Sequence, residues 1–156
     1  MTKKCDCMKQ KAMKKRLLYL ILPIITLILE ILPYGAVCNF MLPSADGTSI
    51  GHFRELYSYF DLTPFGWANF APLFTGIITC IILLLLAIYC ITGKTRLAIM
   101  AKNILYVCVV FSLGPVVLGL HFLSVVGVLI TLCLIGEILL LRHLLKETND
   151  SRETQN

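Results

Sequence analysis

One apolar tract of this chain is too long to fit a single crossing of a lipid bilayer. Residues 104–141 contain no Asp, Glu, Lys or Arg before Glu137. As one helix the tract would be about 57 Å long, nearly twice the roughly 30 Å thickness of a bilayer core. Gly114, Pro115 and Gly119 lie near its middle. The tract is therefore predicted to fold back, with helices at about 98–117 and 121–141.

Two further apolar blocks precede this tract. They run over about 17–37 and 70–91, and the second carries no charged residue. A helix needs roughly 20 apolar residues to span a bilayer. The whole chain is 58% hydrophobic and 15% charged, whereas soluble domains average about 45–50% and 25%. The predicted fold class is an all-α membrane protein with four transmembrane helices, arranged as two antiparallel hairpins in a four-helix bundle.

The basic residues are distributed unevenly along the chain. Seven of the fourteen Lys and Arg residues precede position 17, and only Arg54 lies in the first connection. Cytoplasmic segments of membrane proteins carry the excess of Lys and Arg. This pattern predicts a multi-pass protein of the cell membrane, in particular a bacterial cytoplasmic membrane, with both termini cytoplasmic. The remaining basic residues fit the same assignment: Lys94, Arg96, Lys102, Arg142, Lys146 and Arg152.

These observations predict three parts of the chain: a basic cytoplasmic tail at 1–16, a membrane domain at 17–141 and a polar cytoplasmic tail at 142–156. The first apolar block resembles a signal peptide in following a basic cluster, but it is longer than the 7–15 apolar residues typical of one. We expect an uncleaved anchor. Met1 and Met13 both remain candidates for the start of translation.

The predicted outer loop, residues 43–69, contains a helical pattern. Phe53, Leu56, Tyr57 and Phe60 are spaced i, i+3, i+4 and i+7. That spacing is typical of one face of an amphipathic helix. We expect a short helix that lies on the outer leaflet or covers the bundle as a lid, with a ligand or partner surface as the alternative.

Two residues beyond this pattern are candidates for such a surface. Asp61 begins a segment rich in turn-forming residues, and Trp67, the only tryptophan, ends it. Pro64 and Gly66 favour a defined bend between them. Aromatic side chains with a polar tip favour the membrane–water boundary.

Glu30 is the main candidate functional residue. It lies about 13 residues into the first predicted helix, where a carboxylate costs about 2.5–3.5 kcal/mol on insertion scales. Ionisable residues inside membranes are rare and often functional. The alternative is a protonated Glu30 with a structural hydrogen bond to a neighbour such as Thr26 or to a residue on another helix. Glu137 is a weaker candidate, because it is expected near the inner end of the last helix.

Histidines and cysteines give no metal or redox signature. His52 and His121 are both predicted on the outer side, but two histidines without further ligands do not make a typical metal site. Cys5 and Cys7 lack the second cysteine pair that a zinc site needs. No nucleotide-binding or hydrolase motif is present. We therefore expect no metal, no cofactor and no enzyme activity.

The predicted function is a non-enzymatic structural or accessory subunit of a membrane. The alternative is a small proton- or cation-coupled transporter that uses Glu30. A lipid-modifying enzyme ranks third, with only His52, Asp61 and His121 to work with. The expected partner is the lipid bilayer, with a homo-oligomer or another membrane protein left open. Nucleic acid is not expected, because the basic residues follow the inner membrane surface.

Overall fold

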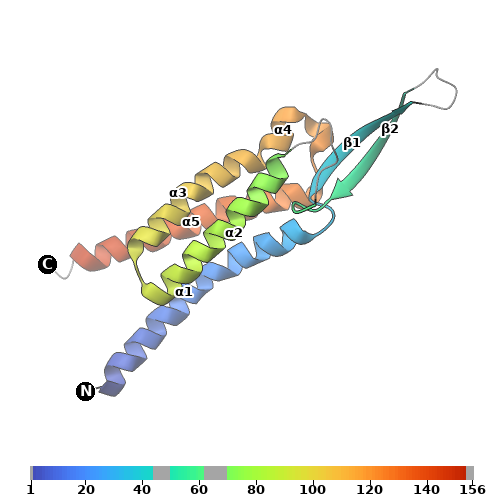
Figure 1. The fold of residues 1–156 in the computed structure, drawn as a ribbon. Helices are drawn as coiled ribbons and strands as arrows, with labels where there is room; N and C mark the ends of the chain where they lie inside the picture. Colours follow the sequence, from blue (N-terminus) through green and yellow to red (C-terminus); the bar gives the residue numbers. More distant parts are fainter. Residues whose placement is uncertain (1, 44–49, 62–69, 154–156) are drawn as a thin grey trace.

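The computed structural model describes residues 2–43, 50–61 and 70–153. These residues are mostly helical, and a single β-hairpin projects from one end of the helices (Figure 1). The elements in chain order are α1 (Thr2–Ile31), β1 (Ala36–Pro43), β2 (Ile50–Tyr57), α2 (Ala71–Thr92), α3 (Thr95–Ser112), α4 (Gly114–Leu118), the 3-10 turn η1 (Leu120–Phe122) and α5 (Val125–Glu153).

The long helices pack side by side in a ring. α1 packs against α2 and α5, and α3 packs against the same two helices. Three helical segments are long and apolar enough to cross a membrane: Ala71–Thr92, Thr95–Leu118 and Val125–Glu147. A shorter apolar helical segment covers Leu17–Ile31. This arrangement is compatible with a membrane-embedded protein.

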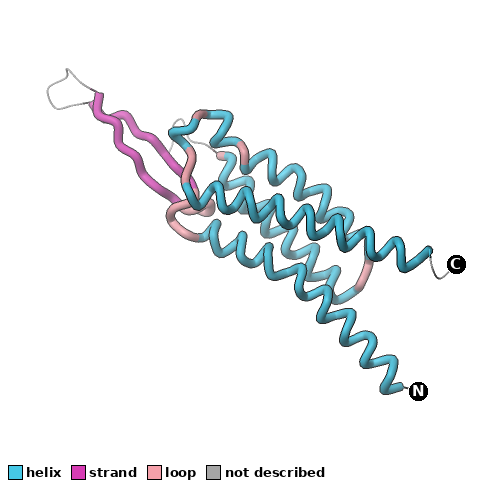
Figure 2. The backbone as a smooth tube through the Cα atoms, turned by 180° about the vertical axis from the view of Figure 1, so that it is seen from behind, coloured by secondary structure: helices cyan, strands magenta, loops and turns pink. Residues whose placement is uncertain are grey.

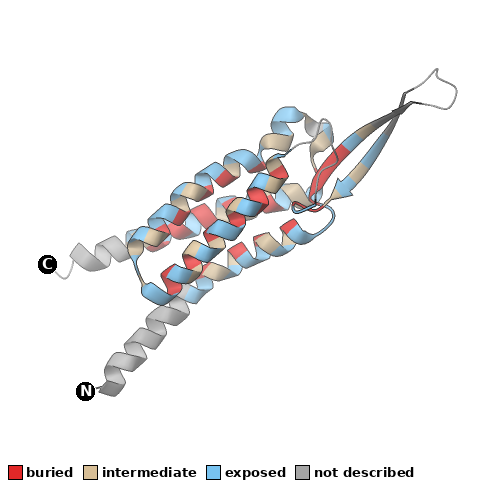
Figure 3. Cartoon of the chain, in the orientation of Figure 1, coloured by how far each residue is buried: buried red, intermediate tan, exposed pale blue. Residues whose placement is uncertain are grey.

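Apolar residues cover the outside of the helices as well as the inside. Ile82, Leu105 and Leu134 are fully buried between the helices, whereas Leu84 and Val110 are more than half exposed. Figure 3 shows buried positions facing neighbouring helices and exposed positions facing outward. A helix that is apolar all round belongs in a large core or in a membrane.

The predicted reversal in the long apolar tract is confirmed, because residues 104–141 do not form one rod. α3 ends at Ser112, and α4 and η1 carry the chain across to α5. Gly119 adopts a φ of 130°, a backbone conformation that residues with a Cβ atom rarely adopt. The predicted third helix at 98–117 is therefore α3 followed by the short α4.

The ends of the first and last helices differ from the prediction. α1 ends at Ile31 rather than Val37. Pro33 explains this end for two reasons. Its ring disfavours a helical conformation at Leu32, and it has no N–H to donate to the Leu29 carbonyl. α5 begins at Val125 and continues to Glu153 rather than ending at Leu141. The residues directly after Leu141 include good helix formers, Arg142, Leu144, Leu145, Lys146 and Glu147.

The amphipathic helix predicted in the outer loop is wrong. Residues 50–57 form β2, which pairs antiparallel with β1 so that Cys38 lies opposite Glu55. The helical spacing of Phe53, Leu56 and Tyr57 was outweighed by pairing with the apolar segment 36–43. The predicted first helix included residues 36 and 37 of this segment, and the predicted outer loop began only at residue 43. Strand preference depends on such partners more than helix preference does.

Both described ends of the chain lie at the end of the helices opposite the hairpin. Figure 2 shows this from behind, with the hairpin in magenta at one end and the two termini at the other. The short connection between α2 and α3 is also at the terminal end, where Gly93 adopts a left-handed φ of 69° and donates its N–H to the Tyr89 carbonyl at 2.8 Å.

Candidate functional site

The residues predicted for an outer surface do not form one site in the part of the chain that the structure describes. Asp61 is exposed and accepts the Ser58 backbone N–H at 2.7 Å, which closes a turn after β2. His121 is exposed in η1. His52 belongs to β2, but its side chain lies outside the description, as does Trp67 entirely. The described residues contain no group of three or more His, Cys, Asp or Glu suited to a metal ion.

Glu30 is fully buried in the last turn of α1. Its Oε1 lies 2.7 Å from the Oγ1 of Thr79 on α2. The same Thr79 hydroxyl lies 3.0 Å from the Thr75 carbonyl of its own helix. Glu30 is thus bonded across the α1–α2 interface.

Glu137 is buried in the middle of α5 and makes the corresponding contact to α1. Its Oε1 lies 2.6 Å from the Oγ1 of Thr26, which in turn lies 3.0 Å from the Leu22 carbonyl. Of the two partners expected for Glu30, Thr26 or a residue on another helix, the structure has the second, Thr79, and Thr26 bonds Glu137 instead. The expectation that Glu137 lies near a helix end is wrong, because α5 continues past Leu141.

The two threonines have fewer hydrogens than acceptors. Each hydroxyl carries one hydrogen but faces both a carbonyl and a carboxyl oxygen. If Thr79 and Thr26 donate to their own helix carbonyls, the carboxyls must donate to the hydroxyl oxygens. A protonated Glu30 and a protonated Glu137 satisfy every one of these contacts, and burial of an uncharged carboxyl avoids the cost of burying a charge.

The two carboxyls lie at neighbouring turns of α1. Thr26, the partner of Glu137, is one helical turn before Glu30 on the same face of this helix. The Oε2 atoms of both are buried and have no hydrogen-bond partner. The other titratable groups near Glu30 are Tyr59, Cys80 and Cys108. Among the described residues no basic side chain compensates either carboxyl.

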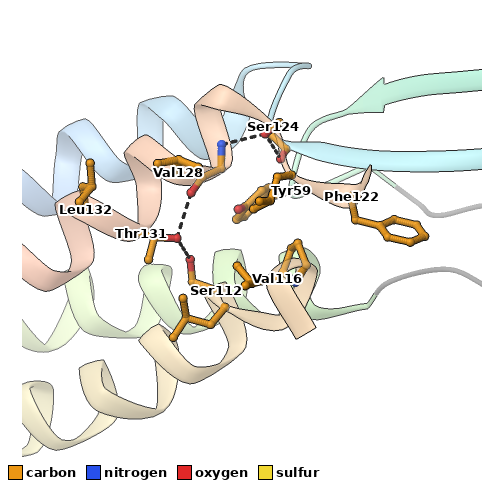
Figure 4. A pocket seen from close by; sticks show the side chains of 13 residues that line it. Tyr59, Ser112, Val116, Phe122, Ser124, Val128, Thr131 and Leu132 are labelled. Carbon is orange, nitrogen blue, oxygen red and sulfur yellow. Dashed lines mark hydrogen bonds between the residues drawn. The ribbon is translucent and has the colours of Figure 1, made fainter. Parts of the chain in front are cut away.

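A cavity of about 200 Å³ opens near the hairpin end of the helices, with Tyr59, Ser112 and Thr131 among the residues that line it (Figure 4). One wall carries hydroxyl groups: Ser112 and Thr131 lie 2.6 Å apart, and Thr131 also donates to the Gly127 carbonyl at 3.0 Å. Ser124 donates to the Gly35 carbonyl at 2.7 Å and accepts the Gly127 N–H at 2.8 Å. These bonds tie α3, α5 and the segment after α1 together around the cavity.

Tyr59 connects the cavity to Glu30. Its ring lines the cavity and is only 2% exposed, and its backbone N–H donates to the Glu30 carbonyl at 2.9 Å. Burial raises the pKa of the Tyr59 hydroxyl above its ordinary value, and Glu30 adds to this, whereas a hydrogen bond with Ser112 opposes it. A Cβ at Gly35 would lie 2.9 Å from the ring, so the ring requires a glycine there.

The sequence interpretation missed several residues of this site. From the sequence, no functional role was assigned to Tyr59, Thr79, Ser112 or Thr131. A usable signal was present, because hydroxyl side chains within three different apolar segments are candidates for partners of a buried carboxyl.

Comparison with known proteins identifies no relative. No protein-family model matches the chain, and neither the curated proteins nor the solved structures contain a significant match. The functional argument therefore depends on the geometry of this chain alone.

Proposed function

We propose that this chain is a small proton-coupled membrane transporter in which Glu30 and Glu137 bind and release the proton. A single observation carries the proposal: two carboxyls are buried at neighbouring turns of α1 within a ring of apolar helices, and each has one oxygen without a hydrogen-bond partner among the described residues. Carboxyls inside membrane helices commonly mark proton relays and substrate pathways.

The proposed topology has four membrane-crossing helices with both termini in the cytoplasm and the hairpin outside. The start of α1, the end of α5 and the α2–α3 connection all lie at the end of the helices that is opposite the hairpin (Figure 1). Lys94, Arg96, Arg142 and Lys146 belong to this end, whereas Arg54 belongs to the hairpin. Positive-inside asymmetry supports this orientation. Reporter fusions that place residue 55 and residue 156 in the same compartment would contradict it.

The carboxyl pair suits a proton carrier because the protonation of one carboxyl affects the protonation of the other. When both are protonated, the site is neutral and compatible with burial. Loss of one proton leaves a carboxylate beside a carboxylic acid. This state costs less free energy than the doubly deprotonated state, in which two negative charges repel each other. Such a pair exchanges one proton readily and holds the second.

The test is an infrared titration of the purified protein in lipid nanodiscs. We expect carbonyl bands of buried protonated carboxyls that disappear in part as the pH rises, and that lose intensity in Glu30→Gln and Glu137→Gln. Glu55→Gln, which removes a carboxyl from the hairpin, is the control and should leave these bands unchanged. Bands that stay constant over the whole pH range in which the protein remains folded would refute the proposal.

A structural or accessory subunit is the second candidate. It is favoured by the threonine partners, since Thr79 and Thr26 already satisfy one oxygen of each carboxyl. In that case Glu30→Gln would preserve both folding and cellular phenotype. A normally inserted Glu30→Gln protein that loses its phenotype would reject this candidate.

A further inference from the structure

We propose that the cavity lined by Tyr59, Ser112 and Thr131 is the substrate site, and that the substrate is a small uncharged ring compound with one hydrogen-bonding group. The inference rests on the proposed transport function and names the substrate class. The site lies at the hairpin end of the helices, on the outer side of the proposed topology.

The lining of the cavity selects against charge. None of the thirteen described residues that line it is acidic or basic, and seven of them are Leu, Val, Pro or Phe, including Leu113, Val128 and Leu132. A charged ligand would lose its hydration there without gaining an ion pair. An uncharged, mostly apolar ligand loses little and gains contact with the aliphatic wall.

The volume limits the size of the ligand. The cavity measures about 200 Å³, and an apolar cavity of about 150 Å³ in another protein is large enough to bind benzene. A molecule of one or two rings therefore fits, whereas drug-sized ligands occupy pockets of about 300–1,000 Å³.

The hydroxyl wall provides the polar contact. Thr131 and Ser112 are already bonded to each other, and Thr131 donates its hydrogen to the Gly127 carbonyl. A hydroxyl oxygen has two acceptor positions. Thr131 uses one of them for Ser112, so its oxygen can still accept one hydrogen bond. A ligand N–H or O–H donor is the complementary group.

Access to the cavity is from the apolar outer surface. Leu113, Val116 and Leu132 line the cavity and are each more than one-third exposed. In the proposed topology these side chains face lipid. Uncharged ring compounds partition into lipid and reach such an opening without crossing water.

Tyr59 couples occupancy of the cavity to the carboxyl pair. Its ring is a wall of the cavity, and its backbone N–H bonds the carbonyl of Glu30. A ligand that displaces the ring therefore acts on the last turn of α1, where the Glu30 side chain meets Thr79. The groups that face Glu30 there are Glu137, Tyr59, Cys80 and Cys108.

The test measures binding of indole to the full-length protein in nanodiscs by calorimetry. We expect saturable binding of indole, weaker binding of toluene, which lacks the N–H, and no binding of benzoate, which is charged. Val128→Trp fills the cavity and should weaken indole binding by about tenfold or more. Leu129→Trp, at a neighbouring position that does not line the cavity, should bind indole as the wild type does.

Two results would overturn the inference. One is indole binding that survives Val128→Trp, and the other is equal binding of indole to nanodiscs with the protein and to empty nanodiscs. The first would place indole elsewhere, and the second would leave lipid chains as the occupant of the cavity. Failure of the transport proposal can be distinguished from failure of this inference. If only the transport proposal fails, indole still binds the wild-type protein but releases no protons from it. Under both proposals indole releases protons from the wild type, and Glu30→Gln binds indole without that release.

Discussion

Replacement of Thr79 by Val tests whether Glu30 depends on this one hydroxyl. Val keeps the shape of the side chain but removes the one hydrogen-bond partner that the described residues give the Glu30 carboxyl, whose Oε2 has none among them. A buried polar group without a partner costs about 1–3 kcal/mol, and side-chain hydrogen bonds between membrane helices are worth about 0.6–1.7 kcal/mol. We expect Thr79→Val to lower the free energy of unfolding by about 1–2 kcal/mol.

Thr75→Val is the matched control, one turn earlier on the same helix and equally buried. The Thr75 hydroxyl donates to the Ala71 carbonyl of its own helix at 2.8 Å and bonds no carboxyl. Its removal leaves no carboxyl without a partner. The expected loss is below about 0.5 kcal/mol, because helix carbonyls retain their backbone bonds.

The assay is reversible unfolding in mixed micelles with increasing SDS, followed by circular dichroism. A double-mutant cycle with Glu30→Leu isolates the pair, since Thr79→Val should cost much less once the carboxyl is gone. The reasoning is refuted if Thr79→Val and Thr75→Val cost the same, or if the cycle shows no coupling between Thr79 and Glu30.

Two further predictions concern the residues beside the helices. Gly35→Ala places a Cβ 2.9 Å from the Tyr59 ring and should destabilise the protein by about 1–3 kcal/mol through overpacking; an unchanged unfolding midpoint would show that the ring moves freely. The Tyr57 hydroxyl donates to the Glu55 carboxylate, and this bond is the largest of the causes that together raise the pKa of Tyr57 to about 12. A raised pKa favours the protonated form, so this contribution to stability is complete below pH of about 10, the unfolded value, and is lost as the pH rises through about 12. Glu55→Gln should move the phenolate absorbance of Tyr57, assigned by comparison with Tyr57→Phe, toward pH 10, and an unchanged titration would contradict the role of Glu55.

Part of the hairpin could have been predicted from the sequence. Asp46-Gly47 is a dipeptide typical of hairpin turns, and it lies between the apolar segment 36–43 and the segment 50–57. The helical spacing around Phe53 obscured this signal. A short segment whose apolar spacing fits both a helix and a strand takes the structure that its packing partner favours. Here the partner strand begins at Ala36, inside the segment 17–37 that was predicted as the first helix.

The carboxyl pair illustrates the opposite case. The sequence marks Glu30 as expensive in an apolar segment, but it does not show what lies next to it. The interaction with Glu137 depends on how α1 and α5 slide past each other, and that alignment is set by contacts such as Leu22 against Gly136. No local property of either segment specifies it.

The sequence by itself determined the helical, apolar character of this chain and the reversal of its longest tract. These properties follow from side-chain polarity, segment length and the backbone limits of Gly and Pro, all of which act locally. Only the tertiary structure decided the hairpin, the end of α1, the pairing of Glu30 with Glu137 and the cavity beside Tyr59. Each of these depends on segments far apart in the chain meeting in one register, which packing determines.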